Sequence, residues 1–485
     1  MKRTTSLLIL MAMLAASAAS CGGEAAATDT TAAAEGDTTP AVTDAAVTEP
    51  VYELPKADFG GRDVQFYIGD TRSKIHVTEE TGDLVNDAIY RRNRKVEEQY
   101  NCNFKYTVTP CAASTWGTWY STLEASIMAN DNSVDIAIGY AYRFSALSVT
   151  SGLFQNLAAL PQIDMSQPWW PGNVTEAAKI GSKLFMVQGN IDPLFYDRIY
   201  TLIFNKEMAS DLKLDFYKDV NDGKWTLDRL EEVAKLGTRD LDGNSTLDEK
   251  DQWGFVTGCD MSMDGFNSAF QLDFVEYDKD GMPKLLPLSE KVVDACTRMK
   301  EFTKKSQTAW HTLEADKKII FEEGRALVMV HNLAGIQTMR DLENDFGIIP
   351  YPKWDEKQEQ YGSFSAGVDN AGGYCIPITA DGEKNAALLE AMAYYGYNDI
   401  LPDYYEKVLK GKNTRDDESA AMLDLIFDNI SFNFCQIYSY AFGDQKAPTM
   451  LMRMTIKNDT EIASTFESDK KIYEDTIAKL IAALK

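Results

Sequence analysis

Histidine is scarce in this sequence. Only His76, His311 and His331 occur in 485 residues, and they lie far apart along the chain. A zinc centre of the histidine type needs several imidazoles at close spacing, so none is indicated. No CxxC pair occurs, and the six cysteines after Cys21 are too few to form a disulfide scaffold in a chain of this length. We expect those six to be small buried apolar side chains, although an exported location would permit a bridge.

Basic residues are also in short supply. Lys and Arg together number 48 against 74 Asp and Glu, which gives a net charge of −26. Such an acidic surface repels nucleic acid and anionic lipid head groups, so no nucleic-acid partner is expected. The content of 45% hydrophobic and 25% charged residues is ordinary for a globular protein, and the length favours two domains or one large two-lobed domain.

The apolar run near the start is too short to cross a bilayer. Residues 1–21 comprise a basic start, an apolar stretch over residues 7–14 and small residues that end on Cys21. This predicts a secretory signal peptide. The ending resembles the lipobox of bacterial lipoproteins, except that Ala18 stands where leucine is preferred. The resemblance implies acylation of Cys21, with palmitate for example, and a lipid anchor at the extracytoplasmic face of the cell membrane. The alternative is an ordinary signal peptide that is cut nearby.

Residues 22–50 contain almost only Ala, Thr, Gly, Asp and Glu and have no aromatic residue. A segment of this kind cannot bury enough apolar surface to offset the ordering of its backbone. We expect a disordered tether that holds a folded body clear of the membrane.

The folded part, residues 51–485, begins with an alternation of predicted elements. Strands are expected at residues 64–68, 104–108 and 134–138, and amphipathic helices at residues 83–100 and 118–128. This alternation predicts an α/β fold with a doubly wound parallel sheet. In such sheets, ligands bind outside the carboxyl ends of the strands.

Several segments together resemble the extracellular solute-binding proteins of family 1, which serve carbohydrate ABC importers. They are residues 83–93, 96–100, 182–185, 204–206, 224–226, 321–325, 346–352 and 409–411. The resemblance implies a periplasmic-binding-protein-like fold of type II, with two α/β lobes joined by crossing segments and closing on a ligand. It places the N-lobe at about residues 51–185 and 363–405 and the C-lobe at about 186–362 and 406–485. It also implies a monomer with a carbohydrate ligand and ABC importer permease subunits as partners.

A carbohydrate site needs aromatic rings that stack on the sugar and polar side chains that bond its hydroxyls. Residues of these types stand at predicted strand ends and interlobe segments. The predicted ligand residues are Asp70, Trp116, Tyr140, Trp169, Trp170, Asp192, His331, Asn332, Asp369 and Tyr438. The alternative for each aromatic residue is a place in the core or in the packing between the lobes.

Residues 240–251 have the oxygen spacing of an EF-hand loop. The predicted calcium ligands are Asp240, Asp242, Asn244, the Thr246 carbonyl, Asp248 and Asp251. Two positions depart from the pattern, because Ser245 replaces the expected glycine and Asp251 replaces the last glutamate. The last aspartate resembles dockerin loops, but those occur in pairs. We expect one structural Ca²⁺ here; the alternative is a solvated acidic turn.

Two other functions remain open from the sequence. A surface glycoside hydrolase needs two placed carboxylates, but 74 acidic residues make such pairs uninformative. An adhesin would hold glycan without transport. No Ser-His-Asp order, nucleophile elbow or P-loop is present, so we expect a binding protein and not an enzyme.

Overall fold

The structure is a computed structural model that describes residues 52–312, 314–339, 342, 344–367, 371–411, 416–443 and 445–484. The predicted signal peptide, the tether, the lipidation of Cys21 and the predicted ligand residue Asp369 lie outside the described residues and stay predictions. The chain divides into two units, Met1–Tyr52 and Glu53–Lys485. All the helices and strands that the structure describes belong to the second unit.

A four-stranded sheet organises one half of this unit. Its order is β12-β3-β1-β2, with the strands β1 (Asp63–Gly69), β2 (Asn103–Thr109), β3 (Ile136–Tyr140) and β12 (Gly372–Cys375). β1 pairs in parallel with both β2 and β3, which confirms the predicted parallel sheet. β12 returns from late in the chain and pairs antiparallel with β3.

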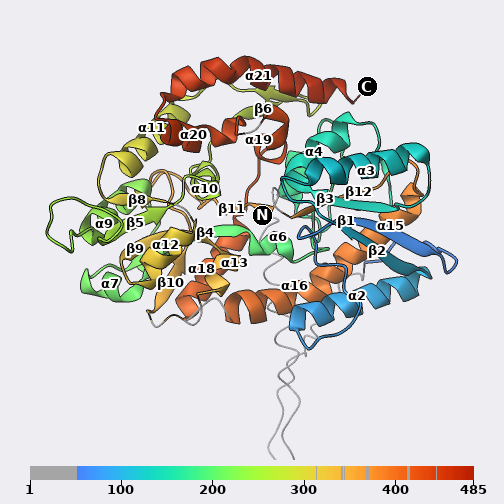
Figure 1. The fold of residues 1–485 in the computed structure, drawn as a ribbon, viewed down its shortest axis with the longest axis horizontal. Coiled ribbons are helices and arrows are strands. Elements are labelled where there is room, and N and C mark those ends of the chain that lie inside the picture. The colour runs from blue at the N-terminus through green and yellow to red at the C-terminus, as the bar shows by residue number, and fades with distance from the viewer. Residues whose placement is uncertain are drawn as a thin grey trace, which may run out of the picture. The chain divides into compact units, whose positions relative to one another are not determined.

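Helices cover both faces of this sheet. They are α2 (Leu84–Tyr100), α3 (Trp116–Ala129), α4 (Ala141–Thr150) and α15 (Gly382–Tyr395), and the short helix α5 (Gly172–Ala178) follows α4 in the chain. α2 begins where the Asp83 carboxylate accepts the N–H groups of Val85 and Asn86, and it ends at Asn101, whose φ of 51° is left-handed. Figure 1 shows α3 on one side of the strands and α2 on the other. The sequence pattern therefore predicted β1, β2, β3, α2 and α3 of this half, but not β12.

A six-stranded sheet organises the other half. Its order is β10-β4-β9-β5-β8, and β11 also pairs with β4. The strands are β4 (Ile199–Asn205), β5 (Trp253–Thr257), β8 (Ala309–His311), β9 (Ala326–Asn332), β10 (Phe346–Ile349) and β11 (Phe364–Ser365). β4 is buried at every position, as a central strand covered on both faces should be. β4 runs antiparallel to β9, whereas β5 runs parallel to β9.

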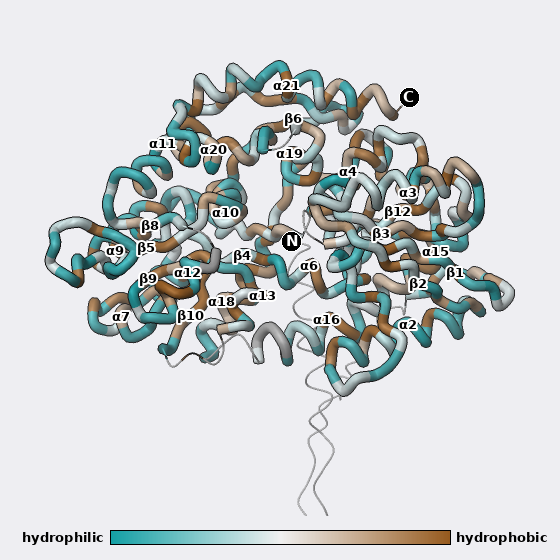
Figure 2. Tube along the Cα trace, viewed as in Figure 1, coloured by the Kyte–Doolittle hydropathy of each residue, from teal (hydrophilic) through white to brown (hydrophobic). Residues whose placement is uncertain are grey.

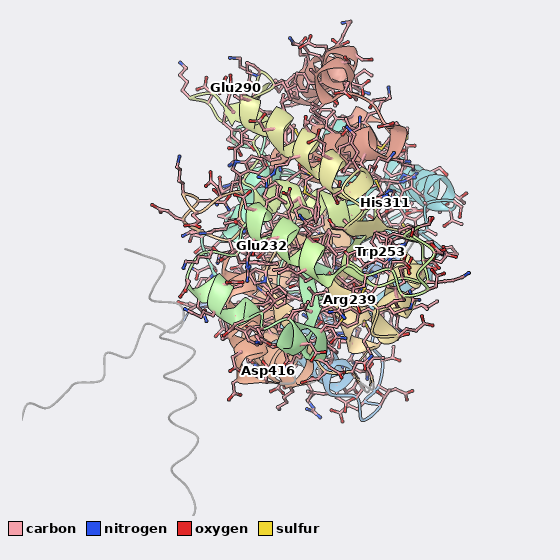
Figure 3. All side chains as sticks on the ribbon, turned by 90° about the vertical axis from the view of Figure 1, so that its left-hand side faces the viewer. Glu232, Arg239, Trp253, Glu290, His311 and Asp416 are labelled. Carbon is pink, nitrogen blue, oxygen red and sulfur yellow. The ribbon has the colours of Figure 1, made fainter. Side chains whose placement is uncertain are left out.

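The helices of this half pack closely on the strands. They are α7 (Lys206–Asp211), α8 (Phe216–Asn221), α9 (Leu227–Gly237), α10 (Met261–Ala269), α11 (Glu290–Lys304), α12 (Glu314–Glu322) and α13 (Leu333–Gln337), with a hairpin of β6 (Val275–Tyr277) and β7 (Pro283–Leu285). A Cβ on Gly254 would lie 1.8 Å from the Ala234 carbonyl oxygen, so only glycine lets α9 approach β5 this closely. Figure 3 shows α9, which carries Glu232, and α11, which begins at Glu290, side by side on this face.

The last part of the chain contacts both halves. It comprises η2 (Gly396–Ile400), α16 (Leu401–Asp403), η3 (Tyr404–Lys410), α18 (Asp417–Asp428), α19 (Phe434–Ile437), η4 (Ser439–Phe442), η5 (Pro448–Met450), α20 (Leu451–Asn458) and α21 (Ile462–Ala482). α21 contacts α4 of one half and both α11 and β7 of the other. The fold is thus α/β with two sheet-centred halves and crossing segments, as predicted. The exact lobe boundaries stay a prediction.

The apolar residues lie inside this framework. Figure 2 shows hydrophobic stretches along the strands and alternating polar and apolar positions along α2 and α21. The six cysteines after Cys21 are free, and five are buried, Cys259 being partly exposed, which largely confirms the expectation for them. Among the described residues, no helix is long and apolar enough to span a membrane.

Candidate ligand-binding site

The carboxyl ends of the strands in both sheets border the segments that join the two halves. Residues 188–198 lead into β4, which begins beside the end of β9, where Tyr200 pairs with Asn332. In the four-stranded sheet, β1 ends at Gly69 and β3 ends at Tyr140. Ligands of α/β sheets bind at such strand ends, so these ends are the first candidate for a binding site.

Three tyrosines and two arginines gather at the ends of β1 and β3. We call Arg72, Tyr140, Tyr142, Arg143 and Tyr440 the aromatic–arginine cluster. The Arg72 guanidinium lies 3.8 Å from the centre of the Tyr140 ring, whose centre is 5.7 Å from that of Tyr142. The Tyr142 ring lies 5.4 Å from Tyr440, and Arg143 lies 4.8 Å from the same ring. All five side chains are partly buried, so the cluster offers both ring surface and cationic donors at one place.

The local sequence explains why these side chains meet. β3 ends at Tyr140 and α4 begins at the next residue, so Tyr142 and Arg143 occupy the first turn of a helix at a strand end. Arg72 comes soon after β1 and is held by a 3.1 Å hydrogen bond from its Nε to the Cys111 carbonyl. A Cβ on Gly69 would lie 2.5 Å from the Cys111 Cβ, so glycine permits the close approach of the two segments.

Two buried carboxylates tie the crossing segments together beside this cluster. Asp192 accepts hydrogen bonds of 2.6 Å from both the Ser73 hydroxyl and the Lys74 N–H. Asp197 pairs with the Lys74 ammonium at 3.0 Å and accepts a hydrogen bond from the Tyr404 hydroxyl. We call Asp192 and Asp197 the hinge carboxylates. They join the loop after β1 to two segments that pass between the halves.

The structure brings three of the predicted ligand residues to the cluster. Tyr140 belongs to it, and Asp70 lies beside Arg72, where its carboxylate accepts the Cys111 N–H at 2.7 Å. Trp116 meets the Tyr140 ring edge-on at 6.5 Å, but it is only 4% exposed and stacks on Trp119 at 5.1 Å. Asp192 lies next to these residues as a hinge carboxylate.

The predicted pair Trp169 and Trp170 lies elsewhere. The two residues are 3% and 1% exposed, and their indole N–H groups donate to the two carboxylate oxygens of Glu390 at 2.9 and 2.7 Å. Glu390 is fully buried in α15. The structure therefore places these rings in packing around a buried carboxylate, and their role in ligand binding stays a prediction.

Three further predicted ligand residues that the structure describes, His331, Asn332 and Tyr438, are not in the cluster. His331 is the last residue but one of β9 and packs on Gly335, where an added Cβ would lie 1.7 Å from the imidazole. The Asn332 side chain accepts the Gly335 N–H at 2.8 Å and caps α13. Tyr438 is buried, and its hydroxyl donates to the Ala178 carbonyl at 2.6 Å. Ligand contact by these residues likewise stays a prediction.

The sequence analysis missed Arg72, Tyr142, Arg143 and Tyr440. A signal existed for two of them, since Tyr142 and Arg143 come directly after the predicted third strand. Tyr440 had no local signal, because it reaches the cluster from some 300 residues further along the chain. Such a contact depends on tertiary packing.

Two cavities lined by described residues lie away from the cluster. One of about 460 Å³ lies between the loop after β1 and α2, and Lys74, His76 and Asn86 contribute to its wall. Another of about 500 Å³ lies between α5, the β6–β7 hairpin and the residues around the start of α19. Its wall includes Glu176 and Tyr277, whose ring is 46% exposed. This second cavity has aromatic and carboxylate groups that would also suit a sugar.

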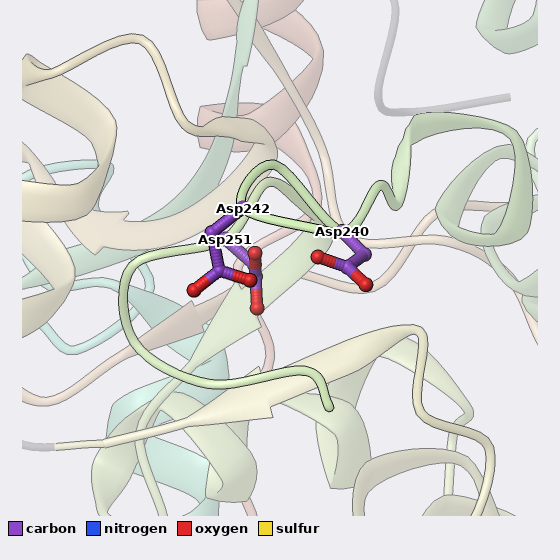
Figure 4. Close-up of side chains that lie close together, drawn as sticks. All are labelled: Asp240, Asp242 and Asp251. Atoms are coloured by element: carbon purple, nitrogen blue, oxygen red, sulfur yellow. The ribbon is translucent and has the colours of Figure 1, made fainter. Parts of the chain in front are cut away.

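The predicted calcium loop brings three carboxylates together. Oxygens of Asp240, Asp242 and Asp251 lie within 4.8 Å of one another, as Figure 4 shows. Asp251 is buried, and its two oxygens accept the N–H groups of Leu241 and Asp248, both at 2.8 Å, so it joins the two ends of the loop. This geometry fits an oxygen-liganded cation.

The other predicted ligands shape the same loop. The Asn244 side chain accepts the Thr246 N–H at 2.6 Å, and the Asp248 carboxylate accepts the Lys250 N–H at 2.8 Å. Ser245, at the position where glycine was expected, adopts a left-handed φ of 65°. The Asp240 carboxylate accepts the N–H groups of Ser245 and Gly243, and the bond from Ser245 is the main reason why its pKa is lowered.

Comparisons with known proteins support the fold. No protein-family model and no curated protein match the sequence. Among solved structures, a cyclo/maltodextrin-binding protein complexed with maltotetraose is similar with a TM-score of 0.54 and 15% identity, covering 88% of this chain and 99% of that one. The cyclic alpha-maltosyl-1,6-maltose binding protein from Arthrobacter globiformis gives a TM-score of 0.54 and 14% identity, with 87% and 99% covered.

A third similar structure is an ABC transporter solute binding protein from Thermotoga lettingae bound with alpha-D-tagatose. It gives a TM-score of 0.50 and 13% identity, covering 87% of this chain and all of that one. This chain has the fold of ABC solute-binding proteins. At these identities, the similarity shows a shared fold and does not identify the ligand of this chain.

Proposed function

We propose that this chain is an extracytoplasmic solute-binding protein that captures a sugar or oligosaccharide for an ABC importer. The observation that carries the proposal is the solute-binding fold over nearly all of the described chain, in which the aromatic–arginine cluster stands at the strand ends. Tyrosine rings stack on the apolar face of a sugar, and guanidinium groups donate to its hydroxyls. The cluster therefore suits a neutral polyhydroxylated ligand.

The cell-surface location and the transporter partners belong to the same proposal. Lipidation of Cys21 would hold the protein at the outer face of the membrane, and residues 22–50 would let the folded unit reach the permease subunits. We expect a monomer without catalytic activity. The two carboxylates beside the cluster, Asp192 and Asp197, are bonded to Ser73 and Lys74, so this pair is not a free acid and base.

Calorimetry and thermal shift with maltotetraose, raffinose and alpha-D-tagatose would test this function. We expect at least one of these sugars to bind and to raise the melting temperature, with no change in the sugar afterwards. The Tyr142→Ala variant should lose most of the affinity, whereas Tyr277→Ala, in the 500 Å³ cavity, should keep it. Release of shorter sugars would indicate a hydrolase. Loss of affinity in Tyr277→Ala but not in Tyr142→Ala would indicate that the ligand binds in the 500 Å³ cavity.

We also propose that residues 240–251 bind one structural Ca²⁺. Support comes from the convergence of Asp240, Asp242 and Asp251 and from the left-handed Ser245 at the turn. The loop joins α9 to β5 in the half built on the six-stranded sheet, whereas four of the five cluster residues lie at or after the ends of β1 and β3 in the other half, so we expect the ion to stabilise the fold and to take no part in ligand binding.

A further inference from the structure

Three buried oxygen atoms in the described part of the chain lie close to one cavity without a hydrogen-bond partner. They are Asp264 Oδ1 and Asn267 Oδ1 of α10 and the hydroxyl oxygen of Ser439, where η4 begins. These residues are 8%, 4% and 1% exposed, and none of the three atoms is bonded to any residue that the structure describes. An unsatisfied buried polar atom is costly, so three together require an explanation.

The three side chains line one small cavity. Its volume is about 10 Å³, and it lies where α10 meets α19, η4 and η5. A single water molecule needs a cavity of about this size, together with two to four polar partners. A sugar ring or a larger solute cannot enter a space so small.

The hydrogen bonds and the ion pair that these side chains already make determine whether each unpartnered atom can donate or accept. Asn267 Nδ2 donates to the carbonyls of Asp264 and Thr449 at 3.1 and 2.6 Å, so its Oδ1 is the acceptor that is left over. Asp264 Oδ2 pairs with the Arg453 guanidinium at 2.9 Å, which leaves Oδ1 as a second acceptor. The Ser439 hydroxyl can donate. The cavity thus offers two acceptors and one donor.

We propose that this cavity is a binding site for one enclosed water molecule that links α10 to Ser439. When Asp264 is ionised, the water donates its two hydrogens to Asp264 Oδ1 and Asn267 Oδ1 and accepts the Ser439 hydroxyl hydrogen. Every unpartnered atom of the three is then satisfied by a single molecule. Arg453 balances the charge of Asp264, and Asp260, which caps α10, is the other carboxylate that acts on it.

The site matters for ligand binding because Ser439 adjoins the aromatic–arginine cluster in the chain. Tyr440 is the next residue, and its ring packs on Tyr142 and Arg143 in the cluster. The water therefore anchors the segment that carries one wall of the cluster. The water site stands independently of the proposed function, whereas this effect on affinity rests on it.

A high-resolution crystal structure of the full chain would test the proposal directly. We expect one solvent peak at about 2.7–3.0 Å from the three oxygens. An empty cavity would overturn the proposal. A peak at about 2.3–2.6 Å from six or more oxygens would also overturn it, because these are the distances of a bound cation.

A double-mutant cycle in urea unfolding tests the bridge in solution. Asp264 and Ser439 share no direct hydrogen bond, so a bridging water predicts coupling between Asp264→Asn and Ser439→Ala beyond what their shared cavity alone would give. The control pairs Ser268→Ala with Ser439→Ala, since Ser268 lines the same cavity without an unpartnered atom. We expect coupling in the first pair and additivity in the second. Additivity in both pairs would contradict the bridge, and the crystal structure decides the matter if a variant does not fold.

Discussion

At the scale of single residues, Glu390 shows how a buried charge is accommodated in this fold. Its side chain is fully buried, and it accepts two indole N–H groups and the Asp164 N–H. Desolvation of a carboxylate is costly unless donors surround it, and here two tryptophans supply them. Trp169 and Trp170, which the sequence analysis predicted to stack on a sugar, are thus hydrogen-bonded to Glu390 of α15. The aromatic residues alone gave no indication of these hydrogen bonds.

The Glu390→Gln variant should lower the free energy of unfolding by about 1–3 kcal/mol, because an amide nitrogen would face an indole N–H and leave buried donors unpaired. Urea denaturation measures this change. Glu383→Gln on the same helix is the control, since Glu383 is exposed at the start of α15 and its substitution should cost only a few tenths of a kcal/mol. Equal small effects of the two substitutions would contradict the role assigned to Glu390.

Asp264 should make stability depend on pH. Burial raises the pKa of its carboxyl group to about 7, with Arg453 opposing the shift. The folded state therefore holds this proton more tightly than the unfolded state, so the contribution of Asp264 to stability is greatest below about pH 4 and is lost as the pH rises to about 7. The unfolding free energy of the wild type minus that of Asp264→Asn should fall over this range, by at most about 1.4 kcal/mol per pH unit.

Urea titrations at several pH values between about 4.5 and about 8 would follow that difference. It should become constant above the folded pKa. Asp273→Asn, an exposed carboxylate, provides the comparison and should show no such trend. A difference that does not change with pH would mean that the carboxyl is charged in both the folded and the unfolded state throughout the range, which would contradict the raised pKa.

At the scale of elements, the local sequence pattern predicted much of the fold. The predicted strand at 64–68 is β1 (Asp63–Gly69), and the predicted helix at 83–100 is α2 (Leu84–Tyr100). These segments have clear periodicity and a capping residue, so nearby residues suffice to define them. β12 was not predicted as a strand of this sheet, because its glycine-rich sequence carries little pattern and its pairing with β3 joins segments that lie far apart in the chain.

The candidate site was predicted less completely for the same reason. Tyr140 and Asp70 were found because they come directly after predicted strands. Arg72 meets Tyr140 only through the register of β1 and β3, and Tyr440 meets Tyr142 only after the last part of the chain has packed on both halves. Contacts that depend on tertiary structure leave no periodic signal in the sequence.

The loop at residues 240–251 gives a prediction at this scale. If it binds calcium, removal of the ion with a chelator should lower the melting temperature, because a ligand that binds only the folded state adds about 2.7 kcal/mol at a hundredfold excess over its dissociation constant. Asp240→Ala should abolish this sensitivity. Asp280→Ala, in the turn of the β6–β7 hairpin, should leave it intact. A wild-type melting curve that chelator does not move would identify the loop as an acidic turn.

At the scale of the whole molecule, the proposed anchor at Cys21 predicts a change of location. The Cys21→Ala variant should appear in the medium or remain unprocessed, because one thiol would carry the lipid. Fractionation of cells measures this, with Cys259→Ala as a control that keeps the predicted lipid site. Membrane association of Cys21→Ala equal to that of the wild type would rule out the lipoprotein.

The two halves and their crossing segments lead to a prediction about motion. If the chain works as solute-binding proteins do, the halves close on a sugar and the radius of gyration falls when the ligand binds. The Lys74 ammonium links the loop after β1 to Asp197 in a crossing segment at 3.0 Å. Lys74→Met should therefore alter the balance between open and closed forms while leaving the cluster side chains in place.

Small-angle scattering with and without a bound sugar compares this variant with Lys95→Met, whose exposed ion pair joins α2 to Asp399. We expect both variants to bind the sugar, and only the Lys74 variant to have a changed radius of gyration without ligand. If the radius of gyration of the wild type stays the same when sugar saturates it, binding does not close the halves.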